Sequence, residues 1–474
     1  MNIKTSIILL FITTSTYAQQ GYDIQFKVQG LQDTTALLGY YYGESTYKRD
    51  TCVVNDKGEF AFQGKEALPQ GVYFIAINKT RVLEFVIGAV QHFKMETSTS
   101  DYIKNMKVTG DPDNKIFFEN MLFNMERNNE AQPFVAIVKD STKNEDAKMA
   151  ARKELDKINE KVMLYHDEII RKYPNTVTSK IFKVTQRLTA PEPPKKADGS
   201  IDSTFQLRWY RQHFFDHFDL SDDANLRLPR PFYSEKINEY LDKLFVPNPD
   251  TLAKAIDFMA AKAKPNQDTY KYFIYQMVLK YQNPDIMGLD RVFVHLYDKY
   301  FATGEMDYWA NETLKKNFRE HADRLRKSLV GNIGANLIMQ DANFQPRALY
   351  DIKNRYTIIY FFDPDCPHCK KETPKLVDFY TKNRARFNLE VFAVSADTSM
   401  QAMRDYIKEM KMQWITVNGP RTYVGHYQDL YDSQTTPTIY VLDDKKKIIA
   451  KKLPTEKLEE FFVNYEKYHP KVVN

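Results

Sequence analysis

The sequence of 474 residues predicts a multidomain protein in which three fold classes follow one another: an all-β sandwich, an all-α middle domain and a C-terminal α/β domain. Three observations support this order. Short alternating apolar segments separated by turn residues extend to residue 113, and apolar residues at spacings of three and four follow to residue 330. From residue 331 to the end, strands alternate with helices around a central sheet. We therefore expect domains over 19–113, 114–330 and 331–474.

The composition indicates a globular chain. Hydrophobic residues make up 43% and charged residues 27% of the sequence, which suits folded domains with proper cores. The 67 basic and 62 acidic residues give a net charge of only +5. Bulk charge therefore predicts no polyanion-binding surface, and nucleic acid is not an expected partner.

The first 18 residues have the pattern of a secretory signal peptide. Lys4 precedes an apolar run over 7–12, and small and hydroxyl residues lead to Ala18, after which we expect cleavage. The apolar run is too short to span a bilayer, so we expect no integral membrane segment in the mature chain. The expected location is the periplasm or cell envelope, where disulfides persist.

The region over 19–113 reads as seven or eight strands with turns between them, such as Asn55-Asp56-Lys57-Gly58. A β-sandwich is the natural arrangement. Cys52 lies in the third expected strand beside Val53 and Val54. We expect it to be a small buried apolar residue without a role in chemistry.

The region over 114–330 has helical periodicity with dense charge between the apolar positions. After two helices that end near residue 173, further helices are expected over 204–218, 234–245, 252–263, 268–280, 289–301 and 311–328. His213 and His217 are four residues apart, a spacing that lets two imidazoles reach one metal ion. No Glu follows the first His and no third ligand is evident, so we interpret both as core or surface histidines.

The most informative stretch begins with an apolar run, Thr357 to Phe362, that predicts a buried strand. Asp363-Pro364-Asp365 ends this strand, and Cys366-Pro367-His368-Cys369 opens a helix. Unpaired N–H groups and the helix dipole favour a thiolate on Cys366, whereas Cys369 lies one turn deeper and is shielded. An exposed attacking thiol next to a buried resolving thiol is typical of dithiol exchange.

Structural zinc is the alternative interpretation of this C-x-x-C motif. It requires four ligands, and Cys52 is the only other cysteine in the chain. We therefore expect no metal, and no cofactor other than the redox-active disulfide between Cys366 and Cys369.

This stretch resembles the active site of the thioredoxin superfamily, in particular of the secreted bacterial thioredoxin-like proteins of the TlpA and ResA kind. Pro374 matches the proline that the superfamily carries five residues after the second cysteine, and Glu372 falls where this subgroup keeps an acidic residue. The resemblance implies that Glu372 assists proton removal from Cys369. A solvated Glu372 on the outer face of the helix is the alternative.

Thr435-Thr436-Pro437, just before an apolar strand, resembles the cis-proline loop of the superfamily. Thr436, Pro437 and Pro367 are thereby implied to bind the substrate chain. The pair Pro367-His368 is also found in strongly oxidising disulfide-forming enzymes, and a hydrogen bond from His368 would lower the pKa of Cys366. His368 is therefore a candidate catalytic residue.

The sequence departs from thioredoxins proper at two places. Asp365 stands where they have Trp, and Tyr360 stands where they have a buried Asp. Asp363 and Asp365 oppose a thiolate on Cys366. We therefore expect the pKa of Cys366 to be lowered, but less than in the strong oxidants.

The other two regions resemble an N-terminal β domain of unknown function and a helical region found in the same multidomain group, without a known chemistry. The implied function is a thiol-disulfide oxidoreductase, a reductase or isomerase in preference to a primary oxidase. Its partners would be a protein disulfide or dithiol substrate and a membrane or periplasmic electron donor. The alternative is an envelope binding or assembly factor that uses the thioredoxin-like domain as a scaffold. A thiol peroxidase is disfavoured because Ile359 and Asp363 replace the Pro and Thr of that motif.

Overall fold

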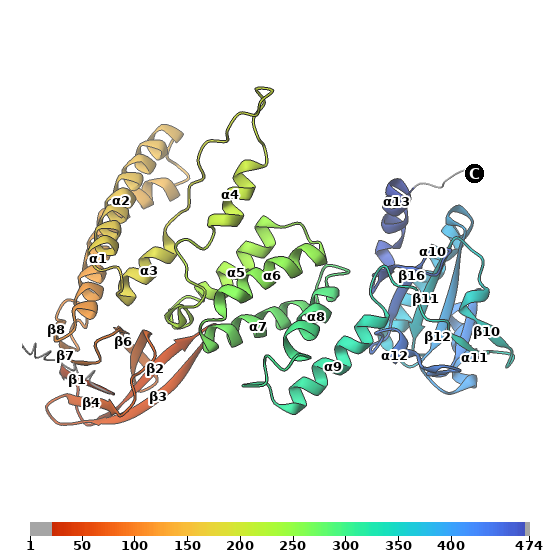
Figure 1. Cartoon of the computed structure of the whole chain (residues 1–474), viewed down its shortest axis with the longest axis horizontal. Helices are drawn as coiled ribbons and strands as arrows, with labels where there is room; N and C mark the ends of the chain where they lie inside the picture. The colour runs from red at the N-terminus through yellow and green to blue at the C-terminus, as the bar shows by residue number, and fades with distance from the viewer. Residues whose placement is uncertain (1–20, 470–474) are drawn as a thin grey trace, which may run out of the picture. The chain divides into compact units, whose positions relative to one another are not determined.

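The computed structural model describes residues 21–469, so the predicted signal peptide over 1–18 lies outside the described residues (Figure 1). The described chain forms two compact units, one of residues 21–244 with 259–270 and one of residues 245–258 with 271–469. In this division, helices before residue 331 belong to the same compact unit as the α/β fold. The domain boundary at residue 331 stays a prediction. Across residues 21–469, no helix has the length and apolar character needed to cross a membrane.

The first unit begins with two four-stranded sheets, ordered β4-β1-β7-β8 and β3-β2-β5-β6. Their strands are β1 (Tyr22–Gln29), β2 (Thr34–Tyr42), β3 (Ser45–Val54), β4 (Glu59–Gly64), β5 (Gly71–Ile77), β6 (Thr80–Ile87), β7 (His92–Ser98) and β8 (Lys107–Thr109). Phe26 of β1 packs edge-to-face on Phe85 of β6, with ring centroids 5.4 Å apart, so the two sheets share one core. The predicted sandwich is confirmed. Cys52, expected to be buried, is only partly buried, because β3 is an edge strand.

The helices of this unit are α1 (Pro112–Lys139), α2 (Glu145–Lys172), α3 (Val177–Thr185), α4 (Phe205–His213), the 3-10 turn η1 (Asp223–Leu226) and α5 (Phe232–Leu244). Helix α3 was not predicted. The expected helix over 204–218 is too long, because α4 ends at His213 and the rings of Phe214 and Phe215 pack on Tyr240. His213 and His217 are therefore not on one helix, and His213 Nδ1 lies 2.7 Å from Asp216 Oδ2.

Helices α6 (Pro249–Ala263) and α7 (Gln267–Tyr281) contribute residues to both units. The second unit continues with α8 (Asp290–Leu296), the π-helical turn η2 (Tyr297–Phe301) and α9 (Glu312–Lys327). We call residues 271–330, which hold α8 and α9, the helical segment.

The α/β fold follows the helical segment and has a seven-stranded mixed sheet of order β10-β9-β13-β12-β11-β16-β17. Its strands are β9 (Ile338–Asp341), β10 (Pro346–Ala348), β11 (Tyr356–Phe362), β12 (Leu389–Ser395), β13 (Ile415–Asn418), β16 (Thr438–Leu442) and β17 (Ile448–Lys451), and a small hairpin of β14 (Arg421–Thr422) and β15 (Gly425–His426) stands apart. The antiparallel hairpin of β9 and β10 begins at Ile338. Strands β11, β12 and β13 are parallel, so their carboxyl ends meet at one edge.

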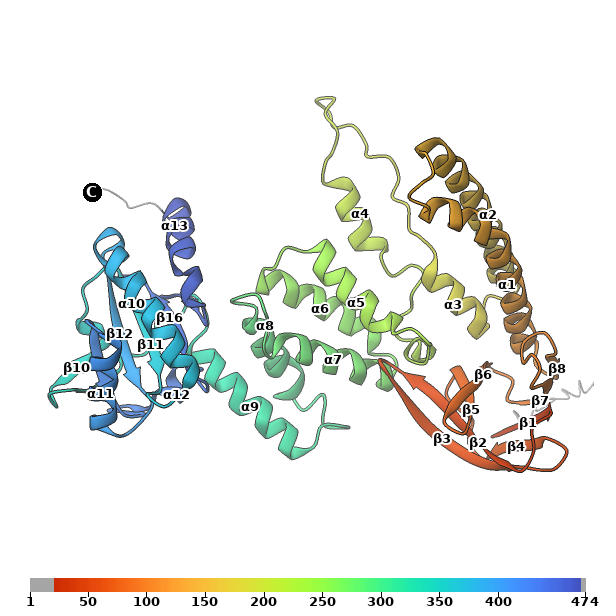
Figure 2. The ribbon, with the colours of Figure 1, turned by 180° about the vertical axis from the view of Figure 1, so that it is seen from behind.

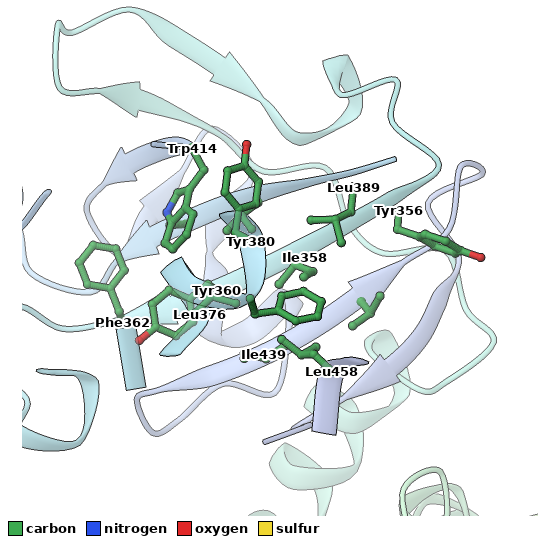
Figure 3. Close-up of a cluster of buried hydrophobic side chains, with 14 of the residues drawn as sticks. Tyr356, Ile358, Tyr360, Phe362, Leu376, Tyr380, Leu389, Trp414, Ile439 and Leu458 are labelled. Carbon is green, nitrogen blue, oxygen red and sulfur yellow. The ribbon is translucent and has the colours of Figure 1, made fainter. Parts of the chain in front are cut away.

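Helices cover both faces of this sheet (Figure 2). They are α10 (Pro367–Phe387), α11 (Met400–Met410) and α13 (Leu458–Tyr468) on one face, and α12 (Tyr427–Leu430) with the 3-10 turn η3 (Leu349–Asp351) on the other. Successive side chains of β11 point to opposite faces of the sheet and pack in different cores. Tyr360 lies in the first core and Phe361 in the second. Figure 3 shows the first core, with Tyr360 and Leu376 side by side.

Candidate active site

The C-x-x-C motif lies at the junction between β11 and α10, as the sequence predicted. The strand ends at Phe362, and the N–H of Cys366 donates to the carbonyl of Asp363 over 3.1 Å, which closes the turn. Cys366 is the N-cap of α10, and its Sγ accepts the N–H of Cys369 at 3.4 Å. A sulfur atom thus occupies the place where helices usually have a hydroxyl or carboxylate cap. Both cysteines are free thiols in this structure.

Backbone N–H groups favour the thiolate of Cys366. Partial burial raises the pKa of Cys366, but hydrogen bonds to its sulfur lower this pKa by more. The N–H of Cys369 makes the largest of these contributions, and the Cys369 thiol, the Thr436 side chain and the N–H of His368 add to it. The pKa of Cys366 is therefore lowered from the ordinary thiol value. This is the expected effect of orphan N–H groups at a helix start on a sulfur anion.

Cys369 has the opposite environment. It is fully buried in the core between β11 and α10, and burial raises the pKa of its thiol to about 12. The N–H of Asp363 donates to its Sγ at 3.4 Å and only partly offsets this effect. The motif therefore combines an accessible thiol that ionises readily with a shielded thiol that holds its proton.

The loop before β16 lies against the reactive thiol. We call residues 432–437 the proline loop. Its Thr436–Pro437 peptide bond is cis, as the resemblance implied, and the carbonyl oxygen of Thr436 lies 3.5 Å from Cys366 Sγ. Strand β16 pairs antiparallel with β11 directly after this loop, which brings Thr436 beside the start of α10.

Pro367 and His368 occupy the exposed first turn of α10. Pro367 is the first residue of the helix, where a missing N–H costs nothing. The contribution of His368 to the Cys366 pKa comes from its backbone N–H. A side-chain hydrogen bond from His368, which the sequence suggested, is not formed with any residue in 21–469.

Glu372 lies one turn after Cys369, and its side chain is 24% exposed. Its carboxylate pairs with Lys375 at 2.6 Å, and Lys375 also pairs with Glu456 at 2.5 Å. Glu372 is thus neither freely solvated nor hydrogen-bonded to Cys369. Its role in proton removal stays a proposal.

A buried cluster of three hydroxyl groups lies beneath the dithiol and was not predicted. Thr373 Oγ1 lies 2.8 Å from the hydroxyl of Tyr360 and 2.7 Å from that of Tyr406. Thr373 follows Cys369 by four residues, so both lie on the inner face of α10. Two sequence signals could have indicated it: this spacing, and Tyr360 at the place where thioredoxins have a buried Asp.

Over residues 21–469, no group of three or more His, Cys, Asp or Glu side chains is arranged to hold a metal ion. What the site offers chemically is a pair of thiols with opposite pKa shifts beside the proline loop.

The fold and this site define a thioredoxin-like domain at the C-terminal end of the chain. Residues 354–448 match the model of a family described as thioredoxin-like. Residues 22–117 and 150–323 match two domains of unknown function, DUF4369 and DUF5106. The chain thus carries a thioredoxin-like domain, preceded by two domains of unknown function.

Several individual proteins are similar to part of this chain. The chain is 21% identical over 145 residues to the thiol-disulfide oxidoreductase ResA of Bacillus cereus, covering 30% of this chain and 81% of ResA. It is 33% identical over 119 residues to human nucleoredoxin, covering 24% of this chain and 26% of nucleoredoxin, so it spans only about a quarter of that relative. A solved domain of a possible thiol-disulfide isomerase from Cytophaga hutchinsonii is 38% identical, with 30% of this chain and 95% of that domain covered and a TM-score of 0.28.

Proposed function

We propose that this protein is a thiol-disulfide oxidoreductase of the bacterial cell envelope that acts as a reductase or isomerase rather than as a primary oxidase. One observation carries the proposal. Cys366 caps α10 with its sulfur and has a lowered pKa, while Cys369, three residues on, is buried with a raised pKa. This asymmetry is what sequential disulfide exchange requires.

In the first step, the Cys366 thiolate attacks one sulfur of a substrate disulfide. A bond forms between Cys366 Sγ and that sulfur, the substrate S–S bond breaks, and the other substrate sulfur leaves as a thiolate that takes a proton from water. Backbone groups of the proline loop pair with the extended substrate chain, since the carbonyl oxygen of Thr436 lies 3.5 Å from the attacking sulfur.

In the second step, Cys369 loses its proton and attacks Cys366 Sγ. The Cys366–Cys369 disulfide forms, the mixed disulfide breaks, and the second substrate thiolate leaves. The substrate has then gained two electrons, which an external dithiol donor must return to the protein. Glu372 is the candidate acceptor of the Cys369 proton, because it follows Cys369 by three residues and so lies on the same face of α10.

We infer the direction of transfer from the groups that surround the thiolate. A strongly oxidising dithiol requires a thiol pKa of about 3.5. Cys366 has helix N–H groups in its favour, but partial burial and the acidic turn of Asp363 and Asp365 act against it. The envelope location rests on the signal-peptide pattern and on the persistence of disulfides there.

Insulin reduction with dithiothreitol as electron donor tests the proposal. Cys366→Ser and Cys369→Ser should each abolish turnover, and only Cys369→Ser should accumulate mixed disulfides. Cys52→Ser is the matched control and should keep full activity. Undiminished turnover in Cys366→Ser would refute the proposal in favour of a scaffold role for the domain.

A further inference from the structure

A buried carboxylate joins the helical segment to the thioredoxin-like domain. Asp432, the first residue of the proline loop, is only 3% exposed. Its Oδ2 lies 2.6 Å from Lys452 Nζ, and its Oδ1 lies 3.8 Å from Nε of Arg324 on α9. A buried carboxylate requires such cationic partners, because a lone charge in the interior is strongly destabilised. Lys452 makes the close ion pair with the first residue of the loop, and Arg324 of the helical segment adds a longer charge contact.

Ser328, just after α9, adds a second contact. Its Oγ accepts the backbone N–H of Asp432 at 3.3 Å and the hydroxyl of Tyr440 at 3.4 Å. Asp432 is the first residue of the proline loop, and Tyr440 lies in β16 just after the loop. The end of α9 therefore holds both the start of the loop and the strand that follows it.

The loop between these anchors is short and reaches the reactive sulfur. Thr436 follows Asp432 by four residues, and its carbonyl oxygen lies 3.5 Å from Cys366 Sγ. Beyond Thr436, the ladder with β11 fixes the loop at Thr438. A segment held at both ends has few ways to absorb a shift of Asp432 without moving Thr436.

We infer that Arg324 and Ser328 of the helical segment are positioning residues, which act through Asp432 to place the proline loop against Cys366. Their effect on catalysis rests on the proposed function, whereas their effect on the Cys366 thiol does not. The helical segment is then a functional part of the dithiol site and not a spacer. A conformational change in α9 would reach the dithiol through Asp432 and Tyr440.

Spatial contact alone does not demonstrate such coupling, so the test must measure it. We would use the full mature chain with Arg324→Met, Ser328→Ala and Asp432→Asn. The control for the first is Arg326→Met, since Arg326 pairs instead with exposed Asp298 at 2.7 Å. The control for the last is Asp429→Asn, on the exposed side of α12.

Two measurements are made on each folded variant. The first is the titration of Cys366 thiolate absorbance at 240 nm, which needs no substrate. The Thr436 side chain contributes to the lowered pKa of Cys366, so displacement of Thr436 should move this pKa upward. The second is insulin reduction, in which KM should rise by about fivefold, the lower end of typical coupling effects, with a smaller change in kcat. Arg324→Lys should restore part of both.

The outcomes separate the two proposals. If the wild-type protein has no turnover, the proposed function fails, and the Cys366 titration still decides the present inference. An unchanged Cys366 pKa and an unchanged KM in folded Arg324→Met and Ser328→Ala would overturn it. Equal changes of the Cys366 pKa and of KM in the control Arg326→Met would also overturn the inference. If Asp432→Asn does not fold, these two milder variants decide the matter alone.

Discussion

The N–H of Cys369 donates a hydrogen bond to the Sγ of Cys366 over 3.4 Å, so the resolving residue helps to stabilise the attacking thiolate through its backbone. The Cys369 thiol is itself buried and remains protonated, with a pKa of about 12. One residue therefore serves the two steps of exchange with two different groups. The different surroundings of Cys366, Cys369 and Cys52 predict different reactivities for the three thiols.

Cys366 should be alkylated by iodoacetamide at a lower pH than the other two thiols. Only the thiolate reacts, and its fraction grows as the pH rises through the pKa. The pKa of Cys366 is lowered, whereas burial raises those of Cys369 and Cys52 to about 12 and about 11. Peptide mass spectrometry after timed labelling measures the three rates. In guanidinium the difference should vanish, and equal rates for Cys366 and Cys52 in the folded protein would contradict the prediction.

Cys52→Ala should leave insulin reduction unchanged. Cys52 lies on edge strand β3 of the first unit, and burial followed by the charge of Asp50 keeps its thiol protonated at neutral pH. The measurement is kcat/KM relative to the wild type. A disulfide from Cys52 to either active-site cysteine in the non-reduced protein would show that this prediction is wrong.

The sequence indicated the reactive part of the site because its signals are local. A buried apolar run, an Asp-Pro-Asp break and two cysteines three residues apart were enough to place Cys366 at a helix start and Cys369 behind it. The cis bond before Pro437 was likewise implied by a short motif next to a strand. These features depend on neighbours within one or two turns.

Other parts of the site depend on residues that are distant in the sequence. Ser328 and Asp432 are 104 residues apart, and Lys375 bridges Glu372 to Glu456 from 81 residues away. Helical spacing gave the correct face for Glu372 but could not identify its partner. The end of α4 at His213 is equally non-local, because packing on Tyr240 and not periodicity decides it.

Thr373→Val should lower the free energy of unfolding by about 1–3 kcal/mol. Valine keeps the shape of threonine but removes the hydroxyl that bonds both Tyr360 and Tyr406, which are fully buried. Their hydroxyls would then lose a partner that water cannot replace. Urea denaturation measures the loss. Thr381→Val, on the exposed side of the same helix, is the control, and an equal loss there would argue against the cluster.

Asp290→Asn should destabilise the second unit by about 3–5 kcal/mol. Asp290 Oδ2 lies 2.5 Å from Lys451 Nζ, and the two side chains are 7% and 4% exposed, so the change leaves a buried ammonium group without its counter-charge. The double variant Asp290→Leu with Lys451→Met should lose much less stability, because neither charge stays buried. Asp298→Asn, from an exposed pair with Arg326, should cost no more than about 1 kcal/mol. Similar losses for the two single variants would refute this prediction.

The reduction potential of the Cys366–Cys369 pair should lie between about −270 mV, the value for thioredoxin, and about −120 mV, the value for the strong oxidant. A thiol pKa below the ordinary value stabilises the reduced form and so raises the potential relative to a dithiol with an unperturbed attacking thiol. The acidic turn limits this effect. Equilibration against glutathione measures the potential.

Asp363→Asn should shift this potential further towards the oxidising end. The change removes a negative charge near the thiolate but keeps the backbone N–H that donates to Cys369 Sγ. Two unit charges about 4 Å apart in a water-like dielectric interact by about 1 kcal/mol, which is roughly 20 mV for a two-electron couple. The Cys366 pKa should fall in parallel. Asp378→Asn, exposed farther along α10, is the control and should change neither quantity. A wild-type potential close to −120 mV would show instead that the Pro367-His368 pair outweighs the aspartates, and the protein would then be an oxidase.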